Sequence, residues 1–517
     1  MERSSPTIYR KPPALRAGNV SLRCALLISA AAAGTSAAGE GIGLAGKVEE
    51  FALSNGLRFA VVERGRLPLV AFHLVAGAGW ADDPPGQAGV SRLVVRMYGK
   101  GTRSLGTRNE ALEQKALREV EVAYDRFSLQ TAWSPQSLGE REHSRVAFKM
   151  AMERAGGFSL GNWFHKVLLF NGASGVSFHV DADTSRIAYT LPSNRAEVFF
   201  ALTSEWLRNA EFRDFYPERD ALAEALSTDL RSSPDARLLR ALLETAFASH
   251  PYRRLIPPGE ELAELRTGAA KAYFRAHYVP SNLTVTVVGD ISAAEVRRLA
   301  AQYFENLPPA PKPSAAVQQA PAQKQPLRAG VPFQEQTLLQ LGWRRPPQGH
   351  QDEAAFELLA ALLGNEPGGW LRGQLLDEKK MARRLGVRTV YPGGRYPCLF
   401  VLSIEPAPGR SLAEVESATL AAIGQLRAAP LSPVLLDAAK ARLLAGVYTQ
   451  LQHDGPLAAR LAQPAHAGGA RGLFDVLAGI GKLTPEKLHR VAGQYFTPEQ
   501  STTVWLSTGA VAAEAAR

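Results

Sequence analysis

Two arginines stand one helical turn apart in the stretch GVSRLVVRMYGKGT, residues 89–102. Glycines flank the stretch and apolar residues fill it, a pattern that predicts a short helix. Side chains at i and i+4 share a helix face, so two histidines at this spacing could bind one metal ion, and an acid at i+3 could act as a general base. Arg92 and Arg96 hold the paired positions, and Val95 holds the third. A guanidinium has no acceptor lone pair and stays protonated, so these residues cannot supply that chemistry.

Two other groups of side chains could in principle bind a metal ion. They are His179, Asp181 and Asp183 along an expected strand, and Glu140, Glu142 and His143 in an expected exposed turn or helix start. A solvated surface is the simpler interpretation of both groups. None of the ten histidines begins a His-x-x-Glu-His or His-Glu-x-x-His motif. The sequence has no Gly-x-Ser-x-Gly elbow and no phosphate-binding loop, and Cys398 falls in an expected buried strand.

The elements that would position these residues are strand patterns followed by helix patterns, without strict alternation. Residues 51–80 predict two strands around Asn-Gly and Arg-Gly turns. After the helix from Gly89, residues 176–192 alternate as further strand, and residues 194–212 are typical of an amphipathic helix. Strands followed by helices predict an α+β fold with a mostly antiparallel sheet and helices packed on one face.

The two halves of the chain share one pattern at their ends. Residues 265–290 and 483–509 each predict a helix, a proline turn and a strand. Pro280 and Pro498 each lie 15 residues after the leucine that begins the segment. This agreement indicates an internal duplication.

A boundary lies between the halves. Residues 308–332 contain seven prolines among Ala, Gln and Lys, a composition that cannot build a core. We therefore predict homologous domains at residues 47–306 and 333–510, joined by a linker at 307–332.

Composition excludes several functional classes. Apolar residues make up 46% of the chain and charged residues 21%, which is ordinary for globular proteins. The formal charge is +10, but no Lys/Arg run with interleaved aromatic residues is present, so we expect no nucleic acid partner. No stretch beyond the N-terminal region is apolar and long enough for a transmembrane helix, so we expect no integral membrane segment.

The N-terminal residues 1–38 resemble an export signal. A basic region ends at Arg23, the apolar run CALLISAAAA follows, and Ser36-Ala37-Ala38 provides a cleavage site. A disordered cytoplasmic leader is the alternative. Cleavage would leave Cys398 as a lone thiol. We expect an exported protein, with the periplasm as its compartment.

Several segments together resemble the insulinase/pitrilysin-type (inverzincin) zinc peptidases and their non-catalytic relatives. These segments are NGLRFAVVE (55–63), GAGWADDPPGQAGVSRLVVRMYGKGT (77–102), the run from HPYRR to VVGD (250–290), and the run from WLRGQ to PAPG (370–409). The resemblance covers about residues 48–510 and implies half of a clamshell made of two homologous domains. Residues 103–170 are longer than the family pattern needs.

The resemblance implies where a zinc site would lie. Active members carry His-x-x-Glu-His on a helix of the first domain, and this motif falls on Arg92, Val95 and Arg96. A further glutamate ligand of the family aligns with Ala225, beside Glu224. The resemblance therefore implies a degenerate site with no metal and no cofactor.

The second domain of active relatives supplies an Arg and, seven residues later, a Tyr that stabilise the developing oxyanion. The matching positions are Asp377 and Arg384, so this half of the chemistry is also missing. We expect no catalytic residue in the chain and predict that it is not a peptidase.

The hypothesis that follows is an inactive family member that pairs with an active zinc-peptidase homologue, or with itself, and helps bind or enclose a peptide. A peptide would add to the strand region 178–189, so Phe178 and Val180 are candidate contacts. Arg92 and Arg96 are either ion-paired surface residues or a basic patch for carboxylates. The alternatives are an active zinc metalloendopeptidase with displaced ligands, and a purely structural subunit of a larger complex.

Overall fold

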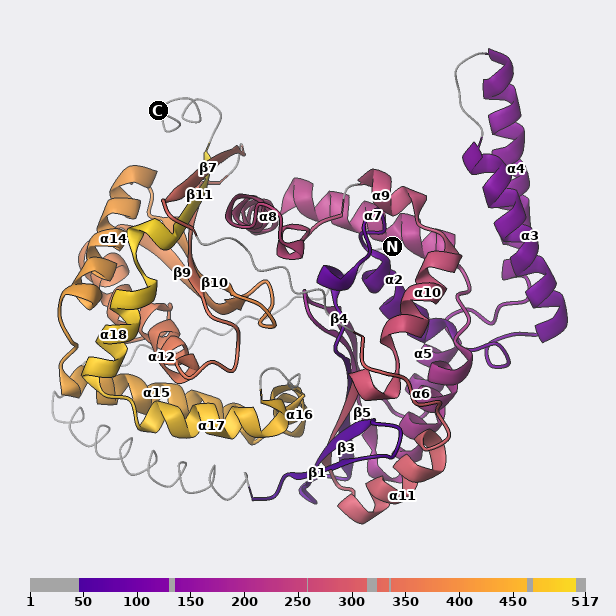
Figure 1. Cartoon of the computed structure of the whole chain (residues 1–517), viewed down its shortest axis with the longest axis horizontal. Coiled ribbons are helices and arrows are strands. Elements are labelled where there is room, and N and C mark those ends of the chain that lie inside the picture. The colour runs from indigo at the N-terminus through magenta and orange to yellow at the C-terminus, as the bar shows by residue number, and fades with distance from the viewer. Residues whose placement is uncertain are drawn as a thin grey trace, which may run out of the picture.

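The structure, a computed structural model, describes residues 46–129, 135–257, 259–313, 323–333, 336–462 and 468–507. These residues form two α+β halves that lie side by side, each with one sheet and its own helices (Figure 1). The expected signal peptide, residues 1–38, lies outside the described residues.

The first sheet has the strand order β1-β2-β6-β3-β5-β4. Its strands are β1 (Glu49–Ala52), β2 (Arg58–Glu63), β3 (Leu69–Ala76), β4 (Ser174–Val180), β5 (Ser185–Pro192) and β6 (Leu283–Gly289). Only β2 and β6 are parallel, and every other neighbouring pair is antiparallel. The predicted turn at Asn55-Gly56 joins β1 to β2, and Gly56 adopts φ +91°, which glycine reaches without steric cost.

The second sheet has the strand order β7-β11-β8-β10-β9. Its strands are β7 (Leu327–Pro332), β8 (Leu338–Arg345), β9 (Ala382–Tyr391), β10 (Cys398–Pro406) and β11 (Ser501–Ser507). Strand β7 pairs parallel to β11, and the other pairs are antiparallel. The two sheets confirm the predicted α+β class.

The end of the predicted linker is wrong. Residues 327–332 form β7 and pair with β11, so they belong to the second half. Pro332 in this segment and Pro326 just before it led the composition argument to assign the strand to the linker. A parallel edge position accommodates them, because only one side of an edge strand needs donors.

The first half contains a long series of helices. They are α2 (Val90–Arg96), α3 (Glu110–Leu129), α4 (Pro135–Gly156), α5 (Trp163–Phe170), α6 (Glu197–Asn209), α7 (Phe215–Ser232), α8 (Pro234–Ala246), α9 (Gly259–Glu264), α10 (Thr267–His277) and α11 (Ala293–Phe304). Alternation along β2 explains how they pack. Phe59 and Val61 join the core of these helices, whereas Ala60 and Val62 face the other side of the sheet.

The second half contributes α12 (Glu353–Leu363), α13 (Trp370–Arg372), α14 (Leu412–Ala428), α15 (Pro433–Leu451), α16 (Asp454–Leu461), α17 (Gly469–Gly481) and α18 (Pro485–Tyr495). Helix α16 packs on the first sheet, in one core cluster with Ala60 and Val62. In return, α8 of the first half packs on the second sheet beside Leu399 and Val401. Each half thus covers one face of the other half's sheet, and strands buried on both faces need continuous apolar runs.

Both predicted end segments have the same structure. Helix α10, a short turn at Pro280–Asn282 and strand β6 close the first half. Helix α18, a turn at Pro498–Gln500 and strand β11 close the second.

Among the described residues, no single helix is long and apolar enough to span a membrane. Helices α14 and α15 reach that length and apolar composition only when they are taken together, and they meet at a bend of 111°.

Candidate functional site

Helix α2 is fixed at its start by a buried carboxylate. Asp83 accepts hydrogen bonds from the backbone N–H of Gly89 at 2.7 Å and of Ser91 at 3.0 Å. These groups would otherwise lack partners at a helix N-terminus. Burial raises the pKa of Asp83 to about 7, against the opposing effect of these hydrogen bonds and of the nearby Arg92. Leu93 and Val94 on the opposite side of α2 enter the core, so the helix presents one defined face.

Two of the three positions of the expected motif, Arg92 and Val95, have other roles in the structure. Val95 is buried in the core. The Nη2 atom of Arg92 donates to the carbonyl oxygen of Leu255 at 2.5 Å. Its Nη1 atom is buried without a hydrogen-bond partner in the part of the chain that the structure describes. Burial lowers the pKa of Arg92, and the nearby Asp83 opposes this effect.

Arg96 belongs to an ion-paired cluster with helix α7. It lies 3.2 Å from Glu218, which also pairs with Lys100 at 2.8 Å. Burial alone would raise the pKa of Glu218, but the hydrogen bonds and charges of Lys100 and Arg96 outweigh it and lower the pKa. The carboxylate that faces α2 is therefore Glu218, which sequence reasoning missed.

The residues expected at the further ligand position lie elsewhere on α7. Glu224 is 72% exposed and pairs with Arg231 at 2.9 Å. Ala225 is exposed and carries no ligand atom. Because Glu218 lies seven residues before Ala225, the two share a helix face, and this spacing could have identified Glu218 from the sequence.

Zinc does not fit this arrangement. Two guanidinium groups and a buried valine occupy the three positions of α2, and both carboxylate oxygens of Glu218 are engaged by cations. Guanidinium cannot coordinate a metal ion. Across the described ranges, no group of three or more His, Cys, Asp or Glu residues could hold a metal ion.

The face of α2 opens into a pocket of about 490 Å³ beside strand β4. Its lining brings together all four residues predicted to bind substrate or a partner, namely Arg92, Arg96, Phe178 and Val180. Among the described strands, β4 is the last strand of the first sheet and pairs with β5 alone. Phe178 is 38% exposed there, and its ring lies 6.0 Å from that of Tyr98.

The two second-half positions do not join this pocket. Asp377 lies in a π-helical turn, Gly373–Glu378, with its carboxylate 3.7 Å from Arg372. Arg384 lies on β9 with its side chain 70% exposed, 3.9 Å from Glu405. Neither residue lines the pocket at α2.

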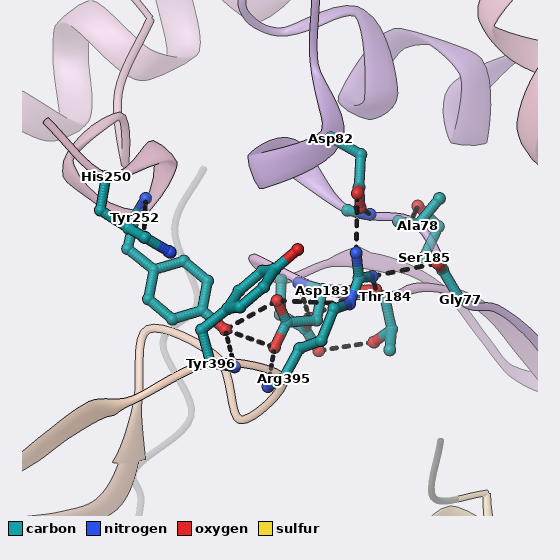
Figure 2. Close-up of polar contacts among 12 residues, drawn as sticks. Gly77, Ala78, Asp82, Asp183, Thr184, Ser185, His250, Tyr252, Arg395 and Tyr396 are labelled. Atoms are coloured by element: carbon teal, nitrogen blue, oxygen red, sulfur yellow. Dashed lines mark hydrogen bonds and ion pairs between the residues drawn. The ribbon is translucent and has the colours of Figure 1, made fainter. Parts of the chain in front are cut away.

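The expectation that His179, Asp181 and Asp183 lie along one strand is wrong, because Asp181 and Asp183 lie in the turn between β4 and β5. Asp183 joins the two halves. Figure 2 shows Tyr252 and Arg395 directed at Asp183 from opposite sides. Asp183 accepts from the Tyr252 hydroxyl at 2.8 Å and from the backbone N–H of Arg395 at 2.8 Å. The Arg395 side chain donates to Asp82 at 2.7 Å and to the carbonyl oxygen of Gly77 at 3.0 Å. These contacts are structural, and they fasten the turn between β9 and β10 to the first half.

The remaining candidates are also occupied or inert. Glu142 pairs with Arg145 on the exposed surface of α4, and His143 Nδ1 lies 2.9 Å from the carbonyl oxygen of Gly139. Cys398 is buried in β10, and burial raises the pKa of its thiol to about 12. A thiol with such a pKa is a weak nucleophile.

A model of the "Peptidase M16 inactive domain" matches residues 267–443. The zinc protease PqqE of Helicobacter pylori is 27% identical over 307 residues, which are 58% of this chain and 68% of that protein. Over these residues the chain is similar to M16 peptidases. These are the insulinase and pitrilysin-type enzymes that the sequence resembles, and the match to the inactive domain agrees with the prediction that this chain is not a peptidase.

Solved structures show the same fold. A protease from Helicobacter pylori superimposes with a TM-score of 0.73 at 20% identity, covering 89% of this chain and 99% of that one. The M16 inactive domain from Pseudomonas fluorescens has a TM-score of 0.67 at 16% identity, covering 89% and 98%. The periplasmic protease PqqL from Escherichia coli has a TM-score of 0.64 at 16% identity, covering 90% of this chain and 48% of that one.

Proposed function

We propose that this M16 chain is a non-catalytic subunit that binds an extended peptide along β4 and pairs with an active zinc-bearing homologue. The observation that carries the proposal is the pocket at α2, where two cationic side chains replace metal ligands beside an uncovered strand. This geometry suits holding a peptide and does not suit cleaving one.

Strand β4 offers backbone groups to a peptide. It pairs with β5 on one side, so alternate N–H and C=O groups on its other side point away from the sheet. All seven of its residues, Phe178 among them, are at least partly accessible, consistent with an open edge. An extended peptide can add to such an edge through main-chain hydrogen bonds.

The charges of the pocket favour a carboxylate on that peptide. Arg92, Arg96 and Lys100 line it together with a single acid, Glu218. The side chain of Arg96 is 39% exposed and can turn toward a ligand, whereas Lys100 can remain with Glu218. A carboxylate and a guanidinium can form two parallel hydrogen bonds.

The proposal of a partner rests on length and fold. This chain spans about half of PqqL, and it matches the first half of that protein with a TM-score of 0.63 over 93% of it. In the proposed assembly, another chain contributes a second pair of domains, either an active homologue or a second copy. We propose export to the periplasm from the N-terminal signal pattern, a compartment that PqqL is described as occupying.

Peptide binding is tested by fluorescence anisotropy with the full chain and two labelled peptides that form no secondary structure, one containing glutamates and the other glutamines in their place. A charged hydrogen bond contributes about 1.5–3 kcal/mol, and partial exposure reduces this to the lower end, about tenfold in Kd. Arg96→Glu should weaken binding of the glutamate peptide, raising its Kd by about tenfold or more. Arg384→Glu makes the same change of charge at a more exposed arginine outside the pocket, and it should leave the affinity for this peptide unchanged.

Two results would contradict the proposal. One is equal affinity for the two peptides, and the other is an equal effect of the two substitutions. Failure to bind either peptide, together with recovery of the chain in a large complex that holds no hydrolase, would favour a purely structural subunit.

A further inference from the structure

The segment between β3 and β4 contains a helical hairpin that takes no part in the proposed peptide site. Helices α3 and α4 pack against each other and rise beyond the rest of the first half, on the side away from the second half (Figure 1). Phe148 and Tyr124 fill the contact between the helices, with ring centroids 5.2 Å apart. The base is anchored by a buried ion pair between Glu113 and Arg213 at 2.7 Å.

One long groove of this hairpin is left open. The α3–α4 groove is a pocket of about 610 Å³ that residues from both helices line. Its floor contains Val122, Ala123 and Ala147, and its α3 rim carries Lys115, Arg118 and Arg126. Val122 is 52% exposed, and Leu129, two turns further along the same face, is 78% exposed. Exposed apolar side chains in a row along a hairpin mark an interaction surface.

The cations of the groove are available to a partner. Lys115, Arg118 and Arg126 form no ion pair within the described residues, although other arginines of the hairpin are paired. Among the described residues, Glu119 is the only acid that lines the groove, and it pairs with Arg154 at 2.8 Å. An apolar floor beside three unpaired cations fits an apolar segment that carries acids.

The charge of the hairpin as a whole separates two kinds of occupant. Together α3 and α4 contain seven Lys and Arg residues against eight Asp and Glu residues. An anionic membrane would meet this nearly balanced surface over a broad area. A single acidic helix would meet only the basic groove. The distribution therefore favours a narrow ligand over a lipid surface.

We propose that the α3–α4 groove binds an acidic amphipathic helix of a partner protein. Leucines of that helix would cover Val122 and Leu129, and acids along its flank would pair with Arg118 and Arg126. The groove lies outside the pocket at α2, so this interaction goes beyond peptide binding and does not depend on it.

The test uses the full chain and two labelled synthetic helices of 20 residues, identical except that flanking glutamates in one are lysines in the other. Anisotropy should show the acidic helix binding at least tenfold more tightly than the basic one at low salt, with loss of affinity as salt rises. The double variant Arg118→Glu/Arg126→Glu should reverse this preference.

A matched control carries the same change of charge on the same hairpin. The double variant Arg145→Glu/Lys149→Glu alters α4 residues that do not line the groove, and it should change affinity less than twofold. Circular dichroism verifies that each variant is folded.

Several results would overturn the proposal. One is equal binding of the two helices, and another is an equal effect of the two double variants. A third is a groove variant that loses affinity for phosphatidylserine vesicles but not for the acidic helix. A concentration-dependent dimer that Val122→Asp abolishes would assign the groove to a second copy of the chain instead.

Discussion

Replacing Arg395 by Gln should weaken the junction between the halves far more than its single position suggests. Its guanidinium joins Asp82, Gly77 and the carbonyl oxygen of Asp183 across the domain boundary. The side chains of Arg395 and Asp82 are 15% and 14% exposed, so the pair is largely removed from water. Breaking a buried ion pair by removing one partner costs about 3–5 kcal/mol. Allowing for this residual exposure, we expect a loss of about 3 kcal/mol in the free energy of unfolding.

The assay is urea denaturation of the full chain followed by tryptophan fluorescence, combined with hydrogen exchange of the β4–β5 turn. Arg388→Gln is the control, because Arg388 also crosses between the halves, to Asp235 at 2.8 Å. That pair is 37% and 40% exposed, so its loss should cost less than about 1 kcal/mol. Equal destabilisation by the two substitutions, or unchanged exchange in the turn, would refute the reasoning.

Three further predictions concern the site and the core. Burial raises the pKa of Asp83 to about 7 in the folded chain, above its ordinary value, so the native state binds the extra proton. Stability from this group should therefore fall as pH rises from about 4 to 7, and Asp83→Asn should flatten that slope in urea midpoints. The variant Arg92→His/Val95→Glu/Arg96→His should not restore cleavage of an unstructured peptide, because the other ligand and oxyanion positions remain unchanged. Efficient zinc-dependent cleavage would show that those positions are misassigned. Cys398 should resist a thiol reagent in the folded chain and react in urea, whereas rapid native reaction would contradict its burial.

Local patterns predicted much of the first half. The Asn-Gly turn, the short helix with its two arginines and the strand that contains Phe178 depend on neighbours in the sequence, and each is found where the pattern placed it. Arg92, Arg96 and Phe178 meet in one pocket because α2 packs beside β4.

Contacts over long distances escaped prediction. Asp183 and Arg395 are 212 positions apart, so no pattern in either segment reveals their contact. For the same reason, the sequence did not predict that α8 packs on the second sheet and α16 on the first. Glu218 was missed for a different reason: the family pattern pointed to position 225, whereas the acid two turns earlier pairs with Arg96 and Lys100.

The central claim is that this chain does not use zinc to cleave peptides. The most direct test measures zinc by mass spectrometry in untagged protein purified alone, together with cleavage of an unstructured peptide with and without chelator. The account predicts far less than one zinc per chain and no chelator-sensitive cleavage. One zinc per chain with cleavage that a chelator abolishes would contradict it.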